Sequence, residues 1–215
     1  MFDLDGTLVD TMRAFADLAA DVMVEHHGVD RAWARGRYLA TSGVPFCKQL
    51  ELIVPGNPAN RAASDDFERR KRAICDRTPM DDETIAALLD IKSFGIKVVL
   101  SSNTGQVFVD DFVSRESFAF DLALGFDEPA RMAKGRPHVS ATCKRLGVAT
   151  GSIWFVGDSL ADSDLARESG LTFIGRLGTF GAGDFERHAP GTRTIGTIQD
   201  LVHLLAAPTA LSAVG

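Results

Sequence analysis

The chain has 215 residues, of which 45% are hydrophobic and 24% are charged. A chain of this length can bury roughly 70% of its unfolded surface, so it can form a stable core without disulfide bonds. Its net charge of -6 argues against nucleic acid as the main partner.

The cysteines and the chain ends predict a cytoplasmic protein with no membrane partner. Cys47, Cys75 and Cys143 are odd in number and lack the spacing of metal or redox motifs, which indicates idle thiols in a reducing compartment. Charged residues begin at Asp3, so no secretion signal is visible. The apolar stretch at 201–215 is too short for a membrane span.

Helical periodicity dominates the first third of the chain, after a short apolar start at residues 1–4. We expect helices over residues 10–27, in pieces over 33–54, from about 64 to 77, and over 80–93. Gly28 is typical of a helix end, and the break within 33–54 falls at Gly43-Val44-Pro45. Ser64 and the acidic residues after it predict the start of the third helix.

Short apolar strands then alternate with helices. The expected strands are residues 1–4, 96–100, 122–124, 153–156 and 171–174, and the expected helices are 106–118, 137–146, 160–169 and 198–205. This alternation predicts an α/β fold, a Rossmann-like parallel sheet flanked by helices. Residues 10–79 interrupt it, so we expect one α/β core domain from residues 1–9 and 80–215, with a helical insert at 10–79.

Polar clusters follow the predicted strands. The first strand leads into Asp3-Leu4-Asp5-Gly6-Thr7, the second into Ser101-Ser102-Asn103-Thr104, and the fourth into Gly157-Asp158-Ser159, with Asp162 beyond. Lys134 precedes the helix that leads to the fourth strand. Because ligands bind beyond the carboxyl ends of strands in open parallel sheets, we expect these groups to meet at one edge.

The chemistry of these groups is mutually consistent. Several carboxylates at one site are costly unless a cation lies between them, and oxygen ligands without His or Cys favour Mg²⁺. Hydroxyls and amides at a strand-to-helix turn, such as those of Ser102 and Asn103, can bind phosphate, and Lys134 can neutralise its charge. Asp3 can act as a phosphoryl-accepting nucleophile, and Asp5 can act as an acid and a base.

Each cluster alone has a simpler interpretation. The Asp3–Thr7 run and Gly157-Asp158 are compatible with turns, Ser102-Asn103 with a helix cap, and Lys134 with a surface position. Their occurrence together, each beside a predicted strand end, favours a shared active site.

The motifs resemble those of the haloacid dehalogenase-like hydrolase superfamily. Residues 2–8 resemble its first motif, residues 98–103 its second, Lys134 its third, and residues 157–162 its fourth. The helical insert, together with Val9-Asp10-Thr11, Gly43-Val44-Pro45 and the final segment 195–205, is similar to the phosphoglycolate phosphatase and β-phosphoglucomutase branch, in which the insert forms a cap. The sequence departs from the family at two places: few residues precede Phe2, and Gly135 rather than proline follows Lys134.

The resemblance implies roles for individual residues. Asp3 would form an aspartyl-phosphate, and Asp5 would protonate the leaving alcohol and then activate water. Mg²⁺ would be bound by Asp3, the Asp5 backbone carbonyl and Asp158. Asp162 would be a further ligand or a support for the ligands; Ser102, Asn103 and Lys134 would bind the phosphoryl group; and Thr11 and Lys48 would contact the substrate.

The resulting prediction is a Mg²⁺-dependent phosphatase that acts on a small phosphorylated metabolite of the phosphoglycolate or sugar phosphate type. Asp5 favours this chemistry over dehalogenation, because haloalkanoate dehalogenases lack a carboxylate at that position of the motif. A phosphomutase of the β-phosphoglucomutase type is the first alternative. A catalytically idle relative that binds a phosphometabolite or a protein is the second. A monomer is the default assembly, and a dimer is compatible with the sequence.

Overall fold

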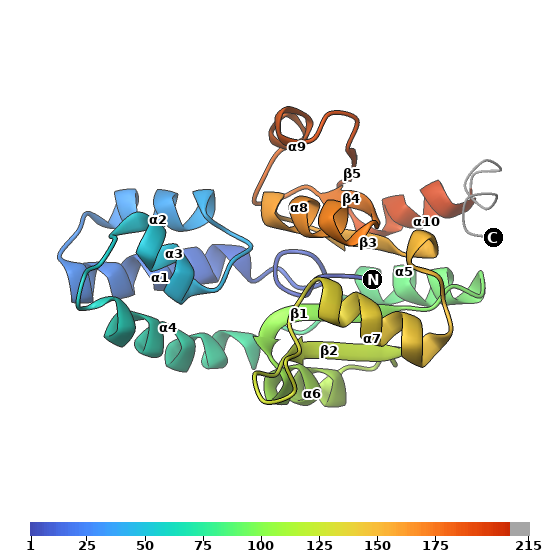
Figure 1. Cartoon of the computed structure of the whole chain (residues 1–215), viewed down its shortest axis with the longest axis horizontal. Helices are drawn as coiled ribbons and strands as arrows, with labels where there is room; N and C mark the ends of the chain where they lie inside the picture. The colour runs from blue at the N-terminus through green and yellow to red at the C-terminus, as the bar shows by residue number, and fades with distance from the viewer. Residues whose placement is uncertain (207–215) are drawn as a thin grey trace. The chain divides into compact units, whose positions relative to one another are not determined.

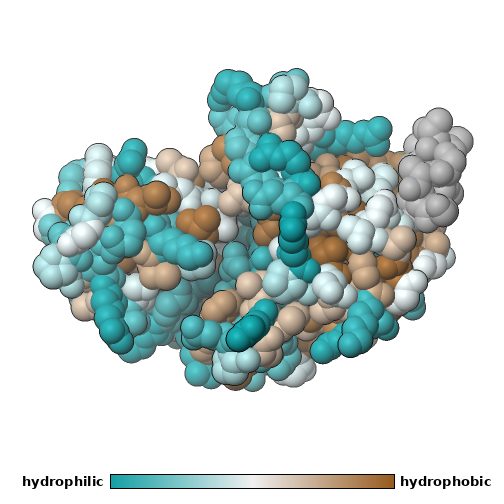
Figure 2. Space-filling model, viewed as in Figure 1, coloured by the Kyte–Doolittle hydropathy of each residue, from teal (hydrophilic) through white to brown (hydrophobic). Residues whose placement is uncertain are grey.

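The computed structural model describes residues 1–206 and contains two compact units (Figure 1). One unit comprises Met1–Val9 together with the described chain from Met80 onward, and the other is Asp10–Pro79. Within the described residues, no helix is both long enough and apolar enough to cross a lipid bilayer. Polar residues cover most of the face shown in Figure 2, with apolar residues in small groups between them.

The unit of residues 10–79 is helical. Its elements are α1 (Met12–His27), α2 (Arg31–Ala40), α3 (Phe46–Ile53) and α4 (Asn60–Cys75). Aromatic side chains form much of its core: the ring centroids of Phe46 and Phe67 are 4.2 Å apart, and Tyr38 contacts both rings. Helix α1 ends as expected at Gly28, which adopts the left-handed conformation with φ 65°.

Helix α4 corrects one prediction. It begins at Asn60, four residues before the expected cap at Ser64, which lies inside the helix. The buried Asn60 side chain donates to Glu51 and to the Val54 carbonyl, and its oxygen is 2.9 Å from His27 Nε2. These tertiary contacts extend the helix beyond the point that local capping propensity indicates.

The other unit is built on a parallel sheet. Its strands are β1 (Val99–Gly105), β2 (Leu122–Phe126), β3 (Trp154–Gly157), β4 (Thr172–Arg176) and β5 (Arg193–Ile195). Strand β1 pairs with β2, while β3, β4 and β5 pair in that order, all in parallel. Phe2 forms parallel bridges with Leu100 and Val156, so residues 1–3 lie between β1 and β3 and join the two parts.

Helices cover both faces of this sheet (Figure 1). They are α5 (Asp82–Ser93), α6 (Gln106–Arg115), α7 (Arg136–Leu146), α8 (Leu160–Ser169), α9 (Ala182–His188) and α10 (Ile198–Ala206), with a 3-10 turn η1 (Thr150–Ser152). The side chains of successive strand residues point to opposite faces of the sheet and pack into two separate apolar clusters, as strand geometry requires. Leu100 and Val156 pack with α5, α6 and α10, whereas Val99 and Phe155 pack with α7 and α8.

The predicted α/β fold with a helix-flanked parallel sheet is confirmed. Helix α9 and strand β5 were not predicted from the sequence. The second strand was predicted to end at residue 100, but β1 continues through the polar cluster to Gly105, with an irregular register between Ser101 and Gly105. Lys134 lies two residues before α7, which begins at Arg136.

Candidate active site

Residues 1–3 form the central strand that carries Asp3. The Phe2 amide donates to the Val99 carbonyl at 2.8 Å on one side, and the Asp3 amide donates to the Val156 carbonyl at 2.9 Å on the other. Beyond Asp3 the chain turns back: the amide of Leu8 donates to the Leu4 carbonyl, and Gly6 adopts φ 78°. This turn needs the glycine, because φ in this range strains residues with a side chain.

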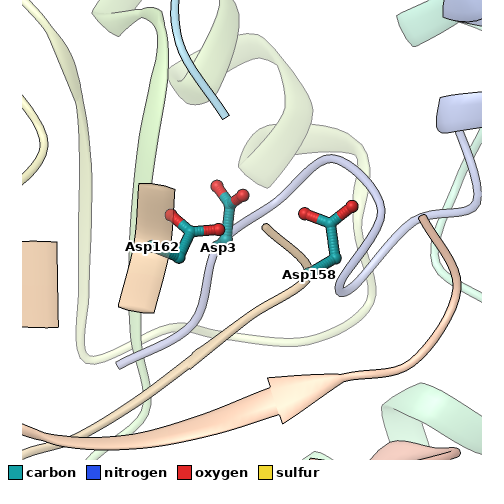
Figure 3. Close-up of side chains that lie close together, drawn as sticks. All are labelled: Asp3, Asp158 and Asp162. Carbon is teal, nitrogen blue, oxygen red and sulfur yellow. The ribbon is translucent and has the colours of Figure 1, made fainter. Parts of the chain in front are cut away.

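Three buried carboxylates meet at the carboxyl end of the sheet. Asp3 comes from the central strand, Asp158 follows β3, and Asp162 lies in the first turn of α8; their ligand atoms lie within 4.8 Å of one another (Figure 3). The predicted meeting of these motifs at one edge is therefore observed. A buried site with this much negative charge needs a cation.

Lys134 supplies part of that positive charge. Its Nζ lies 2.8 Å from Asp3 Oδ1 and 2.5 Å from Asp162 Oδ1, and only 3% of its side chain is exposed. Burial alone would lower the pKa of Lys134, but the carboxylates of Asp162 and Asp3 outweigh burial and raise it, so the lysine stays charged. A surface position for Lys134 is thereby excluded.

One ammonium group does not compensate all three carboxylates. Burial raises the pKa of Asp3 to about 7 although Lys134 opposes the shift, and the charge of Asp162 adds to it. Burial also raises the pKa of Asp158 well above its ordinary value, with a further contribution from the Asp3 charge. Both directions indicate a site with too little positive charge.

The contacts distinguish Asp162 from the other two acids. One Asp162 oxygen accepts from the Ser159 hydroxyl at 2.7 Å and from the Ser159 amide at 3.3 Å, and Lys134 holds the other oxygen. The Asp162 amide donates in turn to the Ser159 hydroxyl at 3.1 Å, which completes the capping box of α8. Lys134 holds one oxygen of Asp3, and Thr179 donates to one oxygen of Asp158 at 2.6 Å. Among the described residues, these contacts engage one oxygen of Asp3 and one of Asp158, so the second oxygen of each can bind a cation.

This donor set fits a hard divalent cation. Asp3 and Asp158 offer buried oxygen atoms without a sulfur or imidazole donor among them, which is the ligand chemistry of Mg²⁺. Asp162 fits better as a support, because its hydrogen bonds fix the start of α8 and the position of Lys134.

The other predicted residues of this unit follow Asp3 in the chain or lie on β1. Asp5 is partly exposed, and its carboxylate accepts from the Thr104 hydroxyl at 3.2 Å. Ser102 is buried and its oxygen accepts from the Thr104 amide at 3.0 Å, so the Ser102 hydroxyl proton can be donated elsewhere. Asn103 is half-buried at the end of β1.

Thr11 and Lys48 belong to the helical unit. Thr11 is buried and directly precedes α1, whereas Lys48 is exposed on α3. Their contact with a substrate stays a prediction.

Sequence reasoning missed two neighbours of the site. Thr179 holds Asp158 from the loop after β4, and the only sequence signal was a hydroxyl residue following a predicted strand. His138 lies buried in α7, where it contacts Ser101, and it had no recognisable motif. Each of the two contacts a residue that is distant in the sequence, Asp158 for Thr179 and Ser101 for His138.

The family assignment rests on the match of residues 1–170 to the model of a haloacid dehalogenase-like hydrolase. The chain belongs to this family, and its prediction as a hydrolase is confirmed. A search of curated proteins finds no significant match.

Several solved structures share the fold. A provisionally named phosphoglycolate phosphatase from Lactobacillus delbrueckii subsp. bulgaricus has a TM-score of 0.79 and 19% identity, over 95% of this chain and 96% of that one. A predicted phosphatase from Clostridium acetobutylicum has a TM-score of 0.76 and 16% identity, over 95% of both chains. A β-phosphoglucomutase from Clostridium difficile has a TM-score of 0.69 and 16% identity, over 93% of this chain and 91% of that one. At these identities the likeness shows the fold alone.

Proposed function

We propose that this protein is a Mg²⁺-dependent phosphatase that hydrolyses a phosphate monoester of a small metabolite, of the phosphoglycolate or sugar phosphate type. One observation carries the proposal: Asp3 is buried against Lys134 and Asp158, while Asp5, two residues later, is partly exposed. A fixed carboxylate beside a cation site and a second, more accessible carboxylate suit covalent phosphoryl transfer.

Asp3, Asp158 and the backbone carbonyl of Asp5 would hold the metal ion. When bound, Mg²⁺ supplies charge neutralisation to the phosphoryl group and to the two carboxylates. Asp162 and Thr179 would keep Lys134 and Asp158 in place through the hydrogen bonds described above.

The side chains divide the reaction into two steps. In the first, an Asp3 oxygen attacks phosphorus, the bond from phosphorus to the ester oxygen breaks, and Asp5 gives its proton to the leaving alkoxide. In the second, Asp5 takes a proton from water, the resulting hydroxide attacks phosphorus, and inorganic phosphate leaves with Asp3 regenerated. Ser102, Asn103 and Lys134 would bind the transferring group throughout.

The helical unit of residues 10–79 is proposed as the cap, and as the source of substrate selectivity. Lys48 is its candidate contact because it is exposed on α3, close in sequence to Gly43-Val44-Pro45. If Lys48→Ala leaves KM unchanged across a panel of phosphorylated metabolites, this assignment is lost.

The direct test is turnover of p-nitrophenyl phosphate with Mg²⁺ and with chelator, followed by a panel of phosphoglycolate, hexose phosphates, pentose phosphates and nucleotides. We expect Mg²⁺-dependent release of phosphate, lost in Asp3→Asn, with Asp90→Asn on the exposed face of α5 as the matched control. An acyl-phosphate trapped with hydroxylamine in the wild type, and absent from Asp3→Asn, would support the covalent step. Retained activity in Asp3→Asn would exclude it.

A phosphomutase is the second candidate, favoured by the likeness to the Clostridium difficile β-phosphoglucomutase. The same Asp3 chemistry would then deliver the phosphoryl group to a sugar hydroxyl. Faster appearance of an isomerised hexose phosphate than of inorganic phosphate would establish the mutase. A folded protein that turns over no phosphate ester would indicate the idle relative.

A further inference from the structure

His138 is a fully buried histidine with both ring nitrogens hydrogen-bonded. It is the third residue of α7, its exposure is 0%, Nδ1 lies 2.8 Å from the Ser101 hydroxyl, and Nε2 lies 3.0 Å from the Gly125 carbonyl. A carbonyl oxygen can only accept, so Nε2 carries the proton and donates to Gly125. Nδ1 therefore accepts from the Ser101 hydroxyl, and the tautomer of the ring is fixed.

The surroundings keep this ring neutral. Burial, with a smaller contribution from the charge of Lys134, lowers the pKa of His138 to about 4 against the opposing effect of the Gly125 hydrogen bond. In the neutral ring, Nδ1 keeps a lone pair that can accept from the Ser101 hydroxyl.

These two hydrogen bonds join three elements of the site. His138 lies on α7, Ser101 on β1 and Gly125 on β2. Ser101 directly precedes Ser102, the candidate phosphate-binding hydroxyl, and Lys134 lies four residues before His138. Ser101 itself is unsuited to phosphate binding, because its hydroxyl proton is already donated to the ring.

The Gly125 end of this linkage is firmly held. The Gly125 amide donates to Gln106 Oε1 at 2.6 Å, and a Cβ at residue 125 would lie 2.7 Å from the Gln106 Cα. The backbone of β2 therefore packs directly against the start of α6, which gives His138 a rigid partner.

We propose that His138 is a positioning residue which, through Ser101 and Gly125, holds Ser102 and Lys134 at the spacing that the transferring phosphoryl group requires. The inference rests on the proposed phosphatase function and deepens it. Ser102 and Lys134 reach the site from different elements, and His138 ties those elements together inside the core. A displacement of about 1 Å between groups that bind one transition state can lower a rate by about 100-fold.

The experiment separates the two hydrogen bonds. His138→Phe removes both, His138→Asn keeps an acceptor near the position of Nδ1, and His138→Gln keeps a donor near the position of Nε2. Ser101→Ala removes the same bond from the other side. His203→Phe, an exposed histidine of α10, is the matched control. The measurements are kcat and KM for p-nitrophenyl phosphate, the inhibition constant of inorganic phosphate, and the midpoint of thermal unfolding.

We expect His138→Phe and Ser101→Ala to lower kcat/KM by about 10- to 100-fold. We expect His138→Asn to recover more activity than His138→Gln, because only the asparagine keeps the bond to β1. Equal activity of the Asn and Gln variants, or a Ser101→Ala variant with wild-type kcat/KM, would overturn the inference even if His138→Phe fails to fold.

Failure of the proposed function has a different signature. It would appear as a wild-type protein without Mg²⁺-dependent turnover. Failure of the inference alone would leave the wild type active and Asp3→Asn inactive, with the Ser101 and His138 variants unchanged. The ring nitrogen shifts of His138 in NMR provide a readout independent of turnover, and a proton on Nδ1 instead of Nε2 would contradict the assignment.

Discussion

The buried charge of Asp3 should destabilise the metal-free protein at neutral and alkaline pH. The Asp3 pKa is about 7 in the folded protein, against an ordinary value of 3.8. Between these two values the folded state binds a proton that the unfolded chain has lost, so the contribution of Asp3 to the free energy of unfolding falls as the pH rises. Above about pH 7 both states are ionised, and this contribution becomes constant.

Asp3→Asn isolates this effect, because asparagine does not titrate. Each pKa unit is worth about 1.4 kcal/mol, and Asp3 is half ionised at pH 7, so the unfolding free energy of Asp3→Asn relative to wild type should rise by about 2 kcal/mol between pH 5 and pH 7. It should then change little from pH 7.5 to pH 9. The substitution is expected to abolish turnover. In the absence of metal, the unfolding free energy of Asp3→Asn relative to wild type should be higher at pH 8 than at pH 5.

Urea denaturation in chelator at half-unit steps from pH 5 to pH 9 measures this difference directly, with Asp90→Asn as the control that should show no such slope. Added Mg²⁺ at about 100 times its dissociation constant should stabilise the wild type by about 2.7 kcal/mol, and Asp3→Asn by less, because one ligand is lost. A relative free energy that stays flat from pH 5 to pH 7 in chelator would refute the argument from burial.

Three further substitutions test other contacts of the site. Lys134→Met should lower the unfolding free energy at pH 8 by about 3–5 kcal/mol and stop turnover, since it leaves buried carboxylates unpaired; urea denaturation showing an unchanged protein would disprove this role. Gly157→Ala places a Cβ 2.6 Å from Asp162 Oδ2, so a loss of about 1–3 kcal/mol and a reduced kcat are expected, and a wild-type thermal midpoint would argue against the packing. Thr179→Val removes the donor to Asp158 and should weaken Mg²⁺ about tenfold, which the Mg²⁺ dependence of turnover measures; an unchanged dependence would show that the hydrogen bond has no effect on the ion.

The sequence predicted the meeting of the acidic motifs because topology alone requires it. In a parallel sheet the carboxyl ends of the strands share one edge, so Asp3 and Asp158 had to come close together once their strands were recognised. The position of Thr179 could not be predicted in this way. It depends on the path of the loop after β4, which no strand or helix periodicity encodes.

Local patterns were also insufficient where tertiary contacts decide the structure. Ser64 is a good helix cap, yet α4 starts at Asn60 because that side chain finds buried partners in His27, Glu51 and Val54. His138 had no signal either, since a histidine in the first turn of a helix is unremarkable until Ser101 and Gly125 are placed beside it.

The backbone of residues 1–3 is hydrogen-bonded on both sides. On one side the Ser101 amide donates to the Phe2 carbonyl, and on the other the Val156 amide donates to the Met1 carbonyl, in addition to the bonds of Phe2 and Asp3 described above. A strand paired on both sides is fixed by about twice as many hydrogen bonds per residue as an edge strand.

The same pairing separates the environments of two carboxylates only two residues apart. Asp3 lies on the paired strand, is buried, and has a pKa of about 7 even with the Lys134 ammonium beside it. Asp5 lies beyond the residues that pair with β1 and β3, beside the turn that Gly6 permits, and remains partly exposed next to the Thr104 hydroxyl. A fixed, dry carboxylate suits a nucleophile that must approach phosphorus in line, whereas an accessible one suits proton exchange with alcohol and water. In the proposed reaction, the position at which pairing with β1 and β3 ends would therefore set which of the two acids takes each role.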